Sequence, residues 1–124
     1  MNLTPFYKSI LDQDRNPIVI CDTAHRILYM NPEAIAHYAK YGGEALLGKS
    51  VLDCHKPASR ENIEKVLGWF AADPTHNHVH TMFLPKENLD IYMIALRDDA
   101  HNLIGYYEKQ ESRDRDETPF YQMH

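Results

Sequence analysis

The chain has 124 residues, a length that suits one domain and leaves no room for a second of ordinary size. Hydrophobic residues make up 44% and charged residues 25%, a composition close to the globular average that excludes an intrinsically disordered chain. The 13 basic and 18 acidic residues give a net charge of −5 with histidines neutral, so no basic field exists to attract nucleic acid.

The chain carries no signal for a membrane or for secretion. No apolar run approaches the roughly 18 residues that span a bilayer, and Met1 to Ile10 lack the layout of a secretory signal. Its 2 cysteines, Cys21 and Cys54, are too few for a disulfide-stapled scaffold, and we expect both to be reduced and buried. These features predict a cytoplasmic protein.

The start of the chain predicts a short amphipathic helix within residues 1–11. Leu3, Tyr7, Ile10 and Leu11 recur at helical spacing and form an apolar stripe that needs a second surface to cover it. We therefore expect this helix to form the contact in a homodimer.

A β-hairpin and a helix come next. The stretch from Pro17 to Asn31 predicts two strands around the polar turn TAH, because both flanks are rich in β-branched and apolar side chains. Asn31 is a good N-cap and Pro32 suits the first helical position, while the glycine pair after Tyr41 ends the helix at about ten residues.

The longest helix is predicted after the segment VLDCHKP, which we expect to form a loop or a single turn. Ser59 is its candidate N-cap. Ile63, Val66, Leu67 and Phe70 then follow the i, i+3, i+4, i+7 pattern of a helix with one buried face.

From His76 onward the hydrophobic period changes to two. The segments NHVHTMFL, LDIYMIAL and LIGYYEKQ are separated by the turn sequences PKEN and DDAHN, which predicts three antiparallel strands joined by short turns. The run Glu111–Glu117 is charged and has no apolar stripe, so we expect residues 111–124 to be a solvated, flexible tail.

This order of elements resembles that of PAS domains. ICDTAHRILYMN is similar to the family's opening hairpin, LLGKSVLDCHKPASRENIEKVL to the motif that precedes its long helix, and ALRDDAHNLIGYYE to its last two strands. The resemblance covers residues 12–110 and implies an α+β fold, in which a five-stranded antiparallel sheet has helices inserted between strands 2 and 3. The DCHxP element is most similar to a bacterial subgroup of the family.

The resemblance implies a sensor module in signal transduction that holds a small ligand between its helices and its sheet. Some PAS proteins with a histidine near the position of His55 bind haem, so haem with gas or redox sensing is the leading specific ligand. Two alternatives stay open: a ligand-free module that dimerises or binds another signalling protein, and a carrier of a small organic molecule. The chain contains no phosphate loop, HExxH or paired catalytic carboxylate motif, which argues against an enzyme.

Five residues are candidates for the ligand site. Haem iron takes an imidazole or a soft sulfur ligand, so His55 is the leading candidate for the metal, with Met93 and Met82 as candidate second ligands. Tyr38 and Trp69 are candidate walls for a flat ligand. The competing interpretation is ordinary, because a loop histidine is often solvated and methionines or aromatics usually fill a core.

The HNHVH run offers a separate interpretation. His76, His78 and His80 would project to one side of a strand, but about 7 Å apart they are too widely spaced to share one ion through bonds of about 2.1 Å. A solvated outer face is therefore favoured over a metal site. Strict alternation would then turn Met82 outward as well, which makes Met93 the better sulfur candidate.

Overall fold

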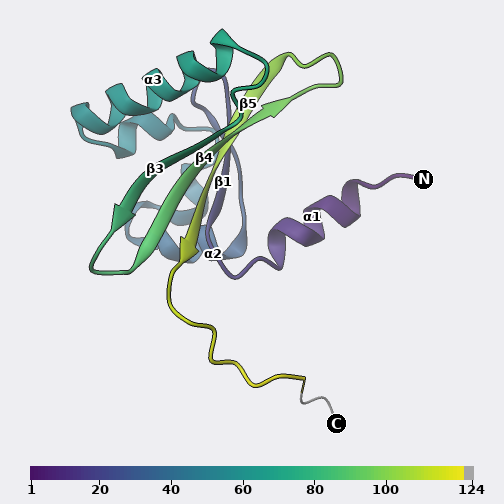
Figure 1. The fold of residues 1–124 in the computed structure, drawn as a ribbon, viewed down its shortest axis with the longest axis vertical. Helices are drawn as coiled ribbons and strands as arrows, with labels where there is room; N and C mark the ends of the chain where they lie inside the picture. Colours follow the sequence, from purple (N-terminus) through teal and green to yellow (C-terminus); the bar gives the residue numbers. More distant parts are fainter. Residues whose placement is uncertain (122–124) are drawn as a thin grey trace.

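A five-stranded antiparallel sheet in the order β2-β1-β5-β4-β3 forms the centre of the computed structural model (Figure 1). The structure describes residues 1–121, apart from the side chain of Cys54. The predicted sheet, with its helices inserted between strands 2 and 3, is confirmed. Its strands are β1 (Ile18–Asp22), β2 (Ile27–Met30), β3 (His78–Leu84), β4 (Leu89–Arg97) and β5 (Leu103–Ser112).

The helical elements between β2 and β3 cover one face of this sheet. Helix α2 packs against β1 and β2, and helix α3 packs against β4 and β5. Three short 3-10 turns connect the two helices. The elements in chain order are α1 (Thr4–Asp12), α2 (Pro32–His37), η1 (Ala39–Tyr41), η2 (Gly43–Leu46), η3 (Val51–Cys54) and α3 (Pro57–Ala72).

Asn31 joins three parts of the fold. Its Oδ1 accepts hydrogen bonds from the amides of Ile18 and Ala34, each at 2.9 Å, so it caps α2 and ties that helix to β1. Its Nδ2 donates to the carbonyls of Leu11 and Asn16, each at 3.0 Å. The side chain is 0% exposed, so these bonds replace contacts with water.

Helix boundaries differ from the predictions at two places. Helix α2 ends at His37, and the rest of the predicted ten-residue helix is the tighter turn η1. The predicted N-cap of the long helix at Ser59 is wrong, because α3 begins at Pro57 with Lys56 as its N-cap. Proline has no amide hydrogen and a helical φ, which makes it a natural first residue of a helix.

The core lies between the helices and the inner face of the sheet. Phe70 of α3 and Tyr106 of β5 are among its largest fully buried side chains. Cys21 is buried with a free thiol, as predicted, whereas the matching prediction for Cys54 falls on a side chain outside the described part.

The end of α3 is held by one arginine. Nη2 of Arg97 donates to the carbonyl of Phe70 at 2.6 Å and to that of Asp73 at 3.2 Å. This contact joins the last turn of the helix to β4.

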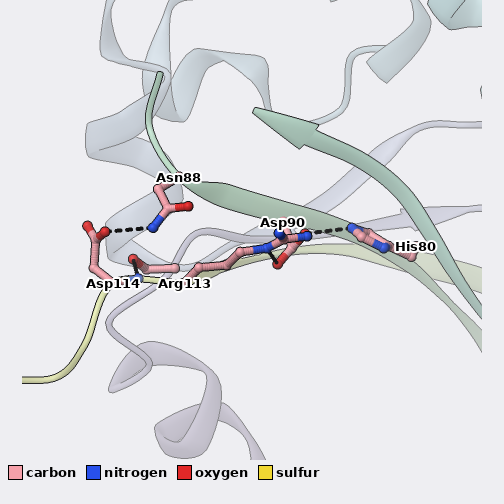
Figure 2. Close-up of polar contacts among 6 residues, drawn as sticks. His80, Asn88, Asp90, Arg113 and Asp114 are labelled. Carbon is pink, nitrogen blue, oxygen red and sulfur yellow. Dashed lines mark hydrogen bonds and ion pairs between the residues drawn. The ribbon is translucent and has the colours of Figure 1, made fainter. Parts of the chain in front are cut away.

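The chain beyond β5 contacts the sheet before it leaves the domain. β5 continues to Ser112 rather than ending at residue 110, and the guanidinium of Arg113 pairs with Asp90 of β4 (Figure 2). Asp116 forms a 2.9 Å ion pair with Arg15 near the start of the chain. Residues 111–121 of the predicted tail are all exposed, but the first two of them belong to β5 and Arg113 and Asp116 have partners in the domain. Residues 122–124 lie outside the described part of the chain.

Helix α1 extends away from the sheet, on the side opposite α3 (Figure 1). None of its residues is buried; Tyr7 and Ile10 of its predicted apolar stripe are exposed, and so is the neighbouring Phe6. Within residues 1–121, no helix has both the length and the apolar character needed to cross a bilayer.

Candidate functional site

A cavity of about 540 Å³ opens between helices α2 and α3 and strands β3, β4 and β5. This volume falls within the range of small-molecule and cofactor sites. Its lining residues are His37, Tyr38, His55, Ser59, Asn62, Ile63, Lys65, Val66, Val79, His80, Thr81, Met82, Leu84, Ile91, Met93, Glu108 and Gln110. A smaller space of about 30 Å³ adjoins it, and Tyr38, His55 and Glu108 line both.

Both predicted methionines line the cavity. Met93, on β4, is 3% exposed and pairs in register with Val79 of β3. Met82, which strict alternation turns outward, lies instead on the cavity side while remaining 46% exposed. The pairing register shifts between His80 and Met82, and such a bulge changes the face to which the following residues point.

His55 follows the turn η3 and is half-buried at the cavity wall. Its Nδ1 lies 2.7 Å from the carbonyl oxygen of Val51. Because a carbonyl only accepts hydrogen bonds, Nδ1 is the donor, and in the neutral ring Nε2 then keeps its lone pair. The geometry leaves an imidazole nitrogen with the chemistry of a metal ligand or a hydrogen-bond acceptor.

Glu108, on β5, is a cavity residue that the sequence analysis missed. It pairs in register with Val19 of β1 and Met93 of β4, both buried. Burial raises the pKa of the Glu108 carboxyl, and the nearby imidazole of His55 opposes part of that rise. The signal in the sequence is alternation, since Glu108 stands two residues after the buried Tyr106 on the same strand.

Gln110 and His37 complete the polar part of the cavity, and neither was predicted. Gln110 follows Glu108 at the next inward position of β5 and is 3% exposed. Its side-chain amide lies 3.4 Å from Nε2 of His37, at the end of α2. The His37 ring packs edge-on against Tyr38 at 4.7 Å, which places the predicted Tyr38 beside these groups.

Trp69 lies outside the cavity, contrary to our prediction. Its side chain is 43% exposed and stacks on the ring of His76, with 3.8 Å between ring centroids. Nδ1 of His76 donates to the carbonyl oxygen of Trp69 at 2.7 Å. Helical phase explains the position, because Val66 and Phe70 occupy the inward stripe of α3 and residue 69 lies beside it.

The three histidines of the HNHVH run do not converge on one point. His76 is held against Trp69, whereas the rings of His78 and His80 lie against Tyr92. Nε2 of His80 also lies 2.7 Å from a carboxylate oxygen of Asp90 (Figure 2). Across the described residues, no group of three or more histidine, cysteine or acidic side chains is arranged to hold a metal ion.

The arrangement can hold a small molecule by two kinds of contact. Apolar side chains from α3, β3 and β4 supply surface that favours an apolar body. Imidazole, carboxyl and amide groups of His55, Glu108 and Gln110 supply a few directed polar contacts. This combination is typical of ligand sites.

Comparison with known proteins agrees with the fold. The profile of a family described as PAS fold matches residues 11–109. Comparison with curated proteins gives no match.

Solved structures with a similar fold are distant in sequence. The C-terminal domain of a Streptococcus mutans protein has a TM-score of 0.69 and 19% identity, over 86% of this chain and 81% of that one. A PAS domain from Colwellia psychrerythraea has a TM-score of 0.66 and 15% identity, over 90% and 97%. The Aer2 receptor from Vibrio cholerae, described as a dual PAS-heme oxygen sensor, has a TM-score of 0.56 and 17% identity, over 80% and 95%.

Proposed function

This chain belongs to the PAS-fold family, and on that premise we propose that it is a sensor domain of signal transduction whose cavity binds a small ligand. The observation that carries the proposal is the cavity of about 540 Å³, which combines apolar walls with directed polar groups. A ligand would act by favouring one conformation or one dimer arrangement over another. A cytoplasmic location and the lack of enzymatic activity stay predictions.

Haem is the first candidate for the ligand. A metal-ligating histidine typically donates its second ring N–H to a backbone carbonyl, and His55 makes this contact with Val51. The residues therefore fit a haem held by the Nε2 of His55, with Met93 and Met82 as candidate second ligands. Haem would supply an iron that binds a diatomic gas or changes oxidation state. The Aer2 receptor, whose description includes heme, supports this candidate by fold alone.

An absorbance titration tests the haem proposal. We expect the protein to be red as purified, or to gain a sharp band near about 400 nm when hemin is added, because iron ligation changes the haem spectrum. His55→Ala should abolish the band, whereas His78→Ala, on the exposed outer face, should retain it. The proposal of haem ligated by His55 is wrong if the wild-type protein does not respond to hemin. It is also wrong if His55→Ala leaves the band intact.

A small organic ligand is the second candidate, and the Glu108 carboxyl favours it. This carboxyl lies on the floor of the cavity, and burial raises its pKa by disfavouring the ionised form. A ligand with a hydrogen-bond donor would stabilise that ionised form. Native mass spectrometry of freshly purified protein tests for such a ligand. A retained small molecule other than haem supports this candidate, and protein that retains no ligand and does not bind hemin favours the ligand-free interaction module.

We also propose that the chain forms a homodimer through α1. The helix presents Phe6, Tyr7 and Ile10 to solvent, and an apolar face of this kind is typically covered by another surface. A signalling protein that reads the ligand state remains a predicted partner, with its identity open.

A further inference from the structure

Two polar side chains stand next to each other on the floor of the cavity. Glu108 and Gln110 are separated by one residue on β5, so both point to the same face of the sheet. The surrounding floor is apolar, because Val19 and Met93 flank Glu108 in register and Ile91 flanks Gln110. The carboxyl and the amide therefore stand side by side on a part of the sheet whose paired neighbours are apolar.

These side chains have unused capacity to accept hydrogen bonds. The Glu108 carboxyl is half-buried at the cavity, with the imidazole of His55 as its nearby charge, and an ionised carboxylate has about four acceptor sites. The amide of Gln110 reaches only His37, at 3.4 Å, which is longer than an ordinary hydrogen bond. A polar group in apolar surroundings is unfavourable until a partner donates to it.

Two cationic or imidazole groups of the cavity wall already have partners outside it. His55 uses its Nδ1 hydrogen on the carbonyl of Val51. Lys65 also lines the cavity, but its ammonium lies 3.3 Å from Glu61 on the exposed side of α3. A ligand that brings its own N–H donor would give the Glu108 carboxyl a direct hydrogen bond inside the cavity.

We infer that the cavity selects an apolar ligand with a cationic or N–H-donating nitrogen head, held by Glu108 and Gln110, over an anionic ligand of the same shape. An amidinium illustrates the chemistry, because its two parallel N–H groups match a carboxylate in a bidentate pair. The inference rests on the proposed ligand-binding function and narrows its organic candidate to one class.

Three probes of nearly equal shape test the inference: benzamidine, benzamide and benzoate. Each would be titrated into the full-length, isotope-labelled protein, shown by absorbance to be free of haem, while the backbone amide signals of Met93, Glu108 and Gln110 are followed by NMR. We expect benzamidine to bind most tightly, benzamide less tightly, and benzoate at least about tenfold more weakly than benzamidine, the difference that a charged hydrogen bond supplies. Benzoate binding as tight as benzamidine binding, or shifts confined to the outer surface, would overturn the inference.

A matched pair of variants locates the effect. Glu108→Gln should weaken benzamidine binding by about tenfold or more and leave benzoate unchanged or slightly tighter. Glu111→Gln removes the same charge from the exposed part of the same strand and should change neither affinity. Equal benzamidine affinity for wild type and Glu108→Gln would show that this carboxyl is not the recognition group.

Failure of this inference can be distinguished from failure of the proposed function. If benzamidine does not bind but the protein takes up hemin or retains an organic molecule, the cavity is a ligand site and the selectivity for nitrogen heads is wrong. If no probe, hemin or retained molecule binds, both the inference and the ligand-binding function fall.

Discussion

Arg113 forms two hydrogen bonds with the carboxylate of Asp90, from Nε at 2.7 Å and from Nη2 at 2.8 Å (Figure 2). Arg113 follows the last strand, whereas Asp90 is a buried residue of β4 that His80 of β3 also contacts. The guanidinium further lies 4.0 Å from the centre of the Phe83 ring. The contact thus joins the point where the chain leaves the domain to the hairpin that forms one wall of the cavity.

Removing this contact should destabilise the domain in a pH-dependent way. Hydrogen bonds from Arg113 hold the pKa of Asp90 below its usual value of 3.8, so the pair stabilises the fold above that value and the stabilisation is lost as the pH falls through the lowered pKa. We expect Arg113→Ala to lower Tm clearly at neutral pH, with a difference from wild type that shrinks as the pH falls from 3.8 through the lowered pKa of Asp90. Thermal unfolding followed by circular dichroism at several pH values measures this difference in Tm.

Arg115→Ala is the matched control for this prediction. It removes the same charge two residues further along the exposed segment, and it should leave Tm nearly unchanged at all pH values. Equal Tm values for Arg113→Ala and Arg115→Ala at neutral pH would show that the pair with Asp90 contributes little.

The cavity carboxyl should show the opposite dependence on pH. Burial raises the pKa of Glu108 above its usual value of 4.5, so the folded state binds the proton more tightly than the unfolded state and loses stability as the pH rises between those two values. Glu108→Gln should therefore raise Tm at neutral pH and have little effect at about pH 4. A Glu108→Gln variant less stable than wild type at neutral pH would mean that the ionised carboxyl has a favourable partner in the fold.

Asn31 should be among the residues least tolerant of substitution. Replacement by alanine removes the cap of α2 and four hydrogen bonds of a fully buried side chain, which should lower the free energy of unfolding by about 2–4 kcal/mol. Asn31→Asp retains the acceptor for Ile18 and Ala34 but loses the donor to Leu11 and Asn16. The loss of unfolding free energy should therefore be no larger for Asn31→Asp than for Asn31→Ala. Urea unfolding measures both, and a loss below about 1 kcal/mol for Asn31→Ala would contradict the prediction.

The apolar stripe of α1 should determine the oligomeric state. The double variant Tyr7→Asp and Ile10→Asp places two charges in the exposed apolar face, so the wild type should sediment as a dimer and the variant as a monomer. Ser9→Asp adds a charge on the same helix without removing an apolar side chain and serves as the control. If the variant still sediments as a dimer, the interface lies elsewhere. If the wild type is a monomer, the prediction of a homodimer is wrong.

Much of the fold could be predicted because its signals are local. Ile63, Val66 and Phe70 mark the buried face of α3 by spacing alone, and Asn31 before Pro32 marks the start of α2. His55 and Tyr38 were also placed at the cavity, since they adjoin the elements that form it. The haem assignment itself remains a proposal for the absorbance titration.

The rest depended on groups that are far apart in the chain. Met82 turned inward because the pairing of β3 with β4 shifts by a bulge, which alternation along one strand does not reveal. Glu108 became a cavity residue because α2 and α3 cover its face of the sheet, and Trp69 was excluded because the packed stripe of α3 runs beside it. Arg113 is tied to the domain by Asp90 and Phe83, which are far from it in the chain.

By itself, the amino-acid sequence determined the order of helices and strands and the turns between them, since periodicity, capping and turn chemistry act between residues close in the chain. Its motifs also carried the resemblance to the PAS family, which the family profile shows. The tertiary structure alone decided which side chains face the cavity, how β3 registers against β4 and which charges pair across strands. Those features depend on contacts between distant segments, and such contacts exist only once the chain has folded.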